Sequence, residues 1–311
     1  MVTRLRARRA LIASIATTLV ACSVSRGGSS DVVLSVAPQP TGWVSLFALP
    51  DATGQKLAIL GWDRANDLRV AFSRGGKVSQ LSERGLEISD MTWMPDGRLL
   101  VALGDITSTS SDLAFVDPAD GKILENLDVD WDLAIDFHSM SVSPNGERVV
   151  VAAGEPGPTF STTDLYLVDL HTGETSLISP TVTSGADEHS PAFMDSMTIA
   201  YVEGQSTIVA GSPNGVVRTL NLQTGDMTQV SRSSFVAESV SASIGSGALV
   251  YDGFMSGARS SQTVWLVEGS QSEQLALLRG PYSRPALDRD GELLVVTNST
   301  AGKVLSGAIP H

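Results

Sequence analysis

Two histidine–serine pairs occupy equivalent places in this sequence, and their residue types could support chemistry. His138-Ser139 lies seven residues before Asn145, and His189-Ser190 lies seven residues before Ser196. Charged residues occur at or near this place in other parts of the chain. The candidate site residues are Asp90, Asp136, His138, Glu188, His189, Glu238 and Arg284. Imidazole and carboxylate groups suit zinc and similar divalent ions. The same set could bind a polar ligand or a partner's basic residue, or it could cap strand ends and link neighbouring structural units.

The elements that position these residues belong to a repeat. A tight turn followed by an aliphatic strand recurs in steps of 43 to 51 residues. Its copies begin at Thr53-Gly54-Gln55, Pro95-Asp96-Gly97, Pro144-Asn145-Gly146, Asp195-Ser196-Met197, Gly245-Ser246-Gly247 and Arg289-Asp290-Gly291. Asp-Gly and Asn-Gly are strong hairpin signals because both residues tolerate positive φ. A second turn recurs out of phase, as in His171-Thr172-Gly173 and Gln223-Thr224-Gly225.

This repeat predicts an all-β fold, a six-bladed β-propeller with four-stranded antiparallel blades. Each unit contains strand, turn, strand, loop, strand, turn, strand. The last unit has sequence enough for three strands only, whereas residues 31–36 form a strand pattern with no partner nearby. We therefore expect residues 31–36 to supply the outer strand of the last blade, because closure removes exposed sheet edges. The candidate site residues would then lie at the start of the innermost strands, near one mouth of the axial channel.

The repeat resembles that of TolB-type, WD-repeat-like six-bladed propellers. The resemblance is carried by Ser143-Pro144-Asn145-Gly146, by Trp93-Met94-Pro95-Asp96-Gly97, and by the turn at residues 169–175. It covers roughly residues 40–300. It implies a propeller that binds a protein or peptide of the cell envelope. Because many unrelated proteins share such a frame, the resemblance specifies the fold better than the function.

The first 21 residues have the pattern of a secretory signal peptide. Four arginines precede an apolar run, residues 10–21, that is too short to span a bilayer. The run ends in Leu19-Val20-Ala21-Cys22, which resembles the bacterial lipobox and contains the only cysteine of the chain. The resemblance implies cleavage before Cys22 and lipidation of its sulfur. We expect a signal peptide at 1–21, the lipidated Cys22 and a flexible linker at 22–30, and the propeller at 31–311, held at the extracytoplasmic face of a bacterial cell membrane.

Composition restricts the partners and the chemistry further. The chain has 21 basic and 34 acidic residues, a net charge of −13, which disfavours nucleic acid as a partner. The sequence lacks a Gly-x-Ser-x-Gly elbow, a phosphate-binding Gly-rich loop and a His-Glu-x-x-His motif. We therefore expect no cofactor and a protein-interaction module rather than an enzyme. The alternative is a propeller that binds a small ligand or a metal in its axial funnel, similar to a lactonase.

Overall fold

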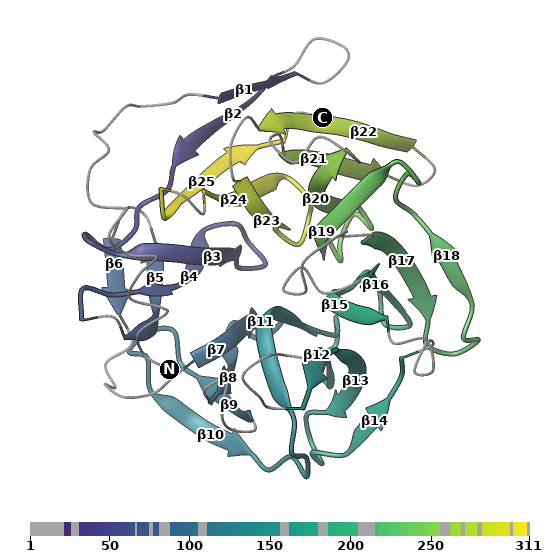
Figure 1. Cartoon of the computed structure of the whole chain (residues 1–311). Coiled ribbons are helices and arrows are strands. Elements are labelled where there is room, and N and C mark those ends of the chain that lie inside the picture. Colours follow the sequence, from purple (N-terminus) through teal and green to yellow (C-terminus); the bar gives the residue numbers. More distant parts are fainter. Residues whose placement is uncertain are drawn as a thin grey trace, which may run out of the picture.

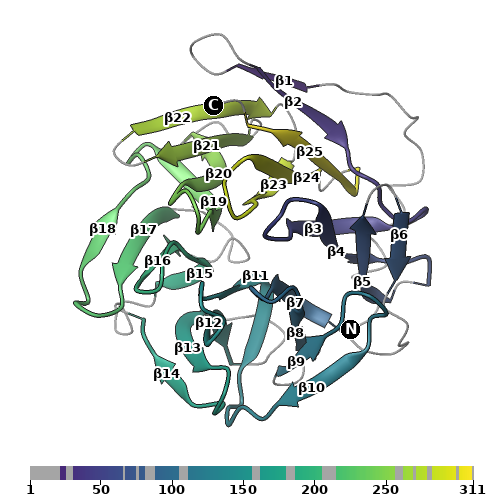
Figure 2. The same cartoon turned by 180° about the vertical axis from the view of Figure 1, so that it is seen from behind.

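The computed structural model describes residues 22–25, 31–65, 67–74, 77–80, 88–104, 111–155, 162–179, 186–204, 215–255, 262–268, 271–278, 282–298 and 301–309. Within these residues the chain forms six antiparallel sheets arranged as a ring around an axis, which confirms the predicted six-bladed β-propeller (Figure 1). The view from behind shows the same closed ring (Figure 2). Among the described residues there is no helix with the length and apolar character needed to cross a bilayer.

Five blades each consist of four consecutive strands, and the first of the four is innermost (Figure 1). Blade 1 contains β3 (Val44–Pro50), β4 (Lys56–Trp62), β5 (Leu68–Arg74) and β6 (Lys77–Gln80). Blade 2 contains β7 (Ile88–Trp93), β8 (Leu99–Leu103), β9 (Asp112–Val116) and β10 (Ile123–Leu127). Blade 3 contains β11 (Ala134–Val142), β12 (Arg148–Gly154), β13 (Asp164–Asp169) and β14 (Thr175–Leu177). Blade 4 contains β15 (Asp187–Phe193), β16 (Thr198–Gly204), β17 (Val216–Asn221) and β18 (Met227–Gln229). Blade 5 contains β19 (Phe235–Ala242), β20 (Leu249–Met255), β21 (Gln262–Glu268) and β22 (Gln271–Leu278).

The sixth blade closes the ring with strands from both ends of the chain. It contains β23 (Tyr282–Leu287), β24 (Leu293–Asn298), β25 (Lys303–Ala308) and β2 (Asp31–Val36). β2 pairs with β25 through Ser35 opposite Ser306 and Val36 opposite Leu305, so the predicted closure is confirmed. Beyond β2, the backbone of β1 (Cys22–Ser25), within the segment expected to be a linker, pairs with β2 and covers its edge.

The repeated turns connect the first two strands of the blades. In blade 2 the amide of Gly97 donates to the carbonyl of Met94 at 3.0 Å, and Gly97 has a φ of 88°. Asp96 Oδ1 accepts from the amide of Arg98 at 3.0 Å, which fixes the turn locally. These contacts explain why Asp-Gly marks the boundary between the two strands.

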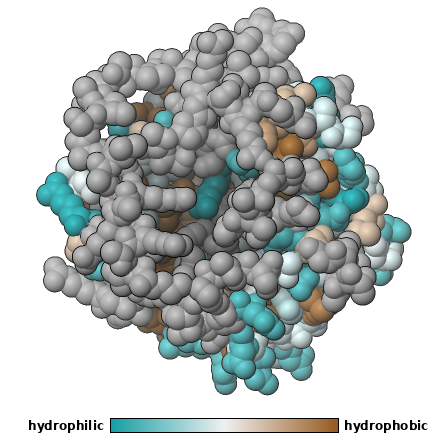
Figure 3. Space-filling view, viewed as in Figure 1, coloured by the Kyte–Doolittle hydropathy of each residue, from teal (hydrophilic) through white to brown (hydrophobic). Residues whose placement is uncertain are grey.

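The hydrophobic core lies between neighbouring blades. One cluster combines Phe47 and Leu60 of blade 1 with Met91 and Leu99 of blade 2, all fully or almost fully buried. The second strands are buried along nearly their whole length, as in β12, because they are covered on both faces of the sheet. On the face shown in Figure 3, hydrophilic residues gather along the lower and right-hand edge of the ring.

Candidate functional site

In each innermost strand the pairing register shifts once, in its first half or near its middle, as at a β-bulge or a similar irregularity. The pairing register shifts between Ser45 and Phe47, Ile88 and Asp90, Ile135 and Met140, His189 and Ala192, Ala237 and Ser239, and Ser283 and Ala286. We call the end of the axis at which these strands begin the bulge face, and the opposite end, with the first turn of each blade, the turn face. Bulges redirect side chains and are frequent beside functional sites.

The seven predicted site residues lie in innermost strands, at or beside these bulges, in blades 2 to 6. Asp136 and His138 lie in β11, but their side chains are outside the described residues. Asp90 and Glu188 are fully buried, whereas His189, Glu238 and Arg284 are half-buried. The residues predicted to be equivalent thus occupy similar positions in the innermost strands of successive blades.

Polar contacts at the bulge face connect neighbouring blades. Asp90 Oδ2 of blade 2 accepts from the amide of Ser139 in blade 3 at 2.6 Å. The amide of Glu188 in blade 4 donates to the carbonyl of Thr163 in blade 3 at 2.9 Å. Asp252 Oδ2 of blade 5 accepts from the amide of Arg284 in blade 6 at 3.3 Å. These contacts link blade 2 to blade 3, blade 3 to blade 4, and blade 5 to blade 6.

Burial raises the pKa of two carboxyl groups in this region to about 7. For Glu188 burial is the main cause, the Ser179 hydroxyl opposes it by donating to Oε2, and nearby acidic groups including Asp164 add to the increase in pKa. For Asp252 burial is again the main cause and the charge of Glu238 adds to it. The hydroxyl of Ser239, which donates to Asp252 Oδ1 at 2.5 Å, lowers the pKa in part.

Two bulge residues adopt an unusual backbone conformation. Ser190 has a φ of 51° and Arg284 a φ of 59°, in the left-handed region that non-glycine residues rarely occupy. Each precedes a proline, Pro191 or Pro285, and a proline disfavours the right-handed helical region for the residue before it. Backbone strain of this kind persists only where the surrounding structure enforces it.

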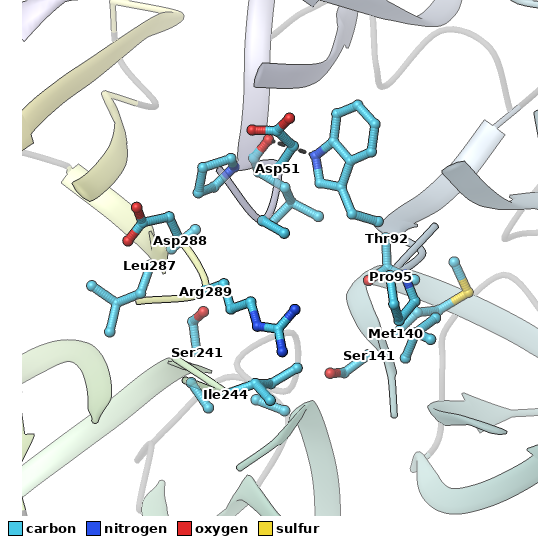
Figure 4. Close-up of a pocket in the computed structure, with 18 of the residues that line it drawn as sticks. Asp51, Thr92, Pro95, Met140, Ser141, Ser241, Ile244, Leu287, Asp288 and Arg289 are labelled. Atoms are coloured by element: carbon cyan, nitrogen blue, oxygen red, sulfur yellow. Dashed lines mark hydrogen bonds between the residues drawn. The ribbon is translucent and has the colours of Figure 1, made fainter. Parts of the chain in front are cut away.

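A cavity of about 150 Å³ lies on the axis at the turn face, and all six blades contribute to its wall (Figure 4). The lining segments are 49–52, 91–95, 140–142 with 144, 191–192, 240–242 with 244, and 286–289. None of the seven predicted residues belongs to this lining. The predicted site residues lie in the first part of the innermost strands, whereas this cavity lies at the ends of those strands.

The cavity wall is mainly apolar, with a few hydroxyl groups, two carboxyl groups and one guanidinium. Trp93 and Met140 are among the large apolar residues in the lining, and Ser141 and Ser241 are among the hydroxyl residues. Figure 4 shows the side chain of Arg289 extending from the blade 6 turn toward the middle of the cavity, away from Asp288. Arg289 belongs to a repeat turn but was not among the predicted site residues; it stands where blades 2 and 3 have the prolines of Pro-Asp-Gly and Pro-Asn-Gly.

The two acidic side chains of the lining accept hydrogen bonds from backbone amides of their own turns. Asp51 Oδ1 accepts from the amides of Gln55 at 3.0 Å and Lys56 at 3.1 Å. Asp288 Oδ1 accepts from the amides of Glu292 at 2.8 Å and Leu293 at 3.0 Å. Over the part of the chain that the structure describes, no three His, Cys, Asp or Glu side chains are placed to hold a metal ion.

The fold and this cavity define a class: an all-β six-bladed propeller, closed by its N-terminal strand, with an axial cavity on the turn face. No protein-family model matches the sequence, and no curated protein matches it. Solved structures share the fold at low sequence identity.

Two of the similar structures are TolB proteins and a third is a gluconolactonase. TolB from Acinetobacter baumannii is 12% identical with a TM-score of 0.56, and the match covers 89% of this chain but 66% of that protein. A putative TolB from Agrobacterium tumefaciens is 15% identical with a TM-score of 0.54, covering 75% of this chain and 86% of the other. A gluconolactonase from Xanthomonas campestris is 16% identical with a TM-score of 0.63, covering 96% and 99%. At these identities the similarity shows the fold alone.

Proposed function

We propose that this protein is an extracytoplasmic lipoprotein whose propeller binds a protein or peptide segment of the cell envelope at the turn face. The observation that carries the proposal is the axial cavity, to which every blade contributes and whose wall combines apolar groups, hydroxyls, the carboxyl groups of Asp51 and Asp288, and a single arginine. Apolar recesses with a few convergent polar groups are the usual form of binding sites. The lipobox-like sequence at residues 19–22 and the fold shared with TolB support the envelope location and the partner class.

Photo-crosslinking from the cavity tests this function. A photoreactive phenylalanine analogue replaces Ile244, which lines the cavity, or Leu124, which is 53% exposed on the outer strand of blade 2. We expect an envelope protein to be cross-linked from position 244 and not from position 124. Adding Ser241→Trp, which fills the cavity, should abolish that adduct, with thermal melting used to show that the variant is folded. An adduct that is equally strong from position 124, or that survives the filled cavity, would contradict binding at the turn face.

A metal- or ligand-binding role at the bulge face is the second candidate function. It is favoured by the placement of the seven charged and histidine residues at one end of the axis, where bulges redirect side chains. Metal analysis of the purified protein, with His138→Ala and His189→Ala as comparisons, tests it. We expect a bound divalent ion that both variants lose if this candidate is correct. A metal-free wild-type protein would remove the metal version.

A further inference from the structure

The side chain of Arg289 is not needed to form its turn. The residue two positions after the innermost strand is Ala52 in blade 1, Pro95 in blade 2, Pro144 in blade 3 and Ile244 in blade 5, and all four line the cavity. In blade 4 it is Asp195, which is not part of the lining. The carbonyl of Arg289 accepts from the amide of Gly245 at 2.7 Å and from Ser243 Oγ at 2.5 Å, so its contacts with blade 5 are made by the backbone. Apolar residues occupy four equivalent positions, so the fold itself does not explain a cation here.

The guanidinium of Arg289 has unused hydrogen-bonding capacity. No hydrogen-bond or ion-pair partner for it occurs among the residues that the structure describes. The nearest acidic residue in sequence on the wall, Asp288, uses Oδ1 to accept from two amides of its own turn, and its side chain lies apart from the guanidinium in Figure 4. A guanidinium presents five N–H donors in a planar fork that matches a carboxylate.

The size and walls of the cavity limit what can reach that fork. A volume of about 150 Å³ accommodates one small group rather than a folded surface; an engineered apolar cavity of about this size binds benzene. Pro95, Met140 and Ile244 are among the apolar residues that line the same cavity as the arginine. A ligand with a carboxylate next to a small apolar group satisfies both features, and a charge-assisted bond in such a recess is stronger than in open water.

We infer that the axial cavity binds a carboxylate carried on a short apolar segment of the peptide partner, with Arg289 as its anion-binding residue. This inference rests on the proposed function and specifies its ligand chemistry. The shared chemistry is the carboxylate, whether it is the C-terminus of the segment or an acidic side chain beside an apolar residue. Arg289 is the group expected to form the charge-assisted bonds, with the hydroxyls of Ser141 and Ser241 on the same wall.

Peptide binding followed by NMR tests the inference on the full mature chain. The probes are acetyl-Gly-Gly-Leu with a free C-terminus and acetyl-Gly-Glu-Leu-amide, with acetyl-Gly-Gly-Leu-amide and acetyl-Gly-Gln-Leu-amide as the uncharged counterparts. Arg289→Gln removes the cation from the cavity. Lys122→Gln is the matched control because it removes one positive charge from an exposed hairpin of blade 2 that does not line the cavity.

We expect one or both carboxylate probes to bind at least about tenfold more tightly than their amide counterparts. Arg289→Gln should remove that preference, and Lys122→Gln should retain it. The probe that binds identifies the C-terminus or the side chain as the source of the carboxylate. Equal binding of acids and amides that Ser241→Trp abolishes would overturn the carboxylate inference and leave the interaction function standing. No binding of any probe, with no cross-linked partner from position 244, would overturn both.

Discussion

The carboxyl groups of Glu188 and Asp252 at the bulge face make hydrogen bonds that connect neighbouring blades. Their burial, however, disfavours the charged carboxylate. Asp252 accepts from the amide of Arg284 and the hydroxyl of Ser239, while Glu188 accepts from Ser179. These contacts favour the charged carboxylate, yet burial outweighs them and raises both pKa values to about 7. The folded ring therefore holds these groups more easily as neutral acids than as anions.

The pKa of Glu188 leads to a pH-dependent stability. Its folded value, about 7, is above its ordinary value of 4.5, so protonation favours the folded state. The stabilising contribution is complete below about pH 4.5 and is lost as the pH rises through 7. Replacing Glu188 with Gln removes the titration and retains an acceptor for Ser179. We expect E188Q to be more stable than wild type at pH 8 by on the order of 1–3 kcal/mol, with a much smaller difference at pH 4.5.

Chemical denaturation at the two pH values measures this effect. Glu125→Gln is the control, because Glu125 is exposed on β10 and undergoes the same chemical change. Its unfolding free energy should differ little from wild type at either pH. An E188Q variant whose stability change is equal at pH 4.5 and pH 8 would show that Glu188 does not titrate as argued.

The closing strand, β2, contains both a buried and an exposed apolar side chain. Leu34 of β2 is 2% exposed and packs with Leu305, Leu294 and Val296 in the cluster between blades 5 and 6. Val36, two residues along the same strand, is 49% exposed. Residues two apart in a strand face the same side of the sheet, so the difference reflects the position of Val36 at the end of β2 rather than the opposite face of the strand. The closure thus depends on packing as well as on backbone pairing.

Leu34→Ala and Val36→Ala separate these contributions. Removing a buried leucine side chain leaves a cavity, so we expect Leu34→Ala to lower the unfolding free energy by about 2–4 kcal/mol. Val36→Ala, at the exposed end of β2, should cost less than about 1 kcal/mol. Deletion of residues 31–36 should lower the melting temperature sharply, because it also exposes the edge of β25. A melt unchanged by that deletion would contradict closure by β2.

Equivalent outer turns in blades 3 and 4 differ in how closely they contact the rest of the molecule. Gly173 and Gly225 have almost identical φ values, 76° and 75°. A Cβ on Gly173 would lie 2.1 Å from the carbonyl oxygen of Asp128, whereas a Cβ on Gly225 would meet nothing within 4 Å. The blade 3 turn is therefore packed against the segment before β11, and the blade 4 turn is open.

Gly173→Ala and Gly225→Ala form a matched pair for this contact. Both place an L side chain in the left-handed region, which costs about 1–2 kcal/mol. Only Gly173→Ala adds the clash with Asp128, so we expect it to destabilise the protein by at least about 1 kcal/mol more than Gly225→Ala. Thermal or denaturant unfolding of both variants measures the difference. Equal losses would mean that the Asp128 segment moves aside freely.

At the scale of the whole molecule, the repeat made the ring predictable because each blade uses the same local signals. Asp-Gly and Thr-Gly turns specify hairpins locally, and the surplus strand at residues 31–36 indicated how the ring closes. The bulges and the positive φ of Ser190 and Arg284 could not be predicted, since they arise from the fit between innermost strands around the axis. The cavity was likewise hidden, because turn residues from six blades meet only in the folded ring. An alignment of the repeats could have exposed Arg289 as the one basic residue at this position, where the other blades have Ala52, Pro95, Pro144, Asp195 and Ile244.

The path of the N-terminal strands bears on how the ring would be held at a membrane. β1 pairs with β2 at the outer edge of blade 6, with Cys22 opposite Leu34, so Cys22 lies at the periphery of the ring and away from the axis (Figure 1). A lipid on Cys22 would therefore leave the axial cavity accessible.

We expect Cys22→Ala to move the protein from the membrane fraction to the soluble extracytoplasmic fraction, because two or three acyl chains supply the anchoring energy, at about 0.8 kcal/mol for each buried methylene. Fractionation with mass spectrometry of the N-terminus measures this, with Ser23→Ala as the neighbouring control. Wild-type protein that retains residues 1–21, or Cys22→Ala protein that stays membrane-bound, would contradict the anchor.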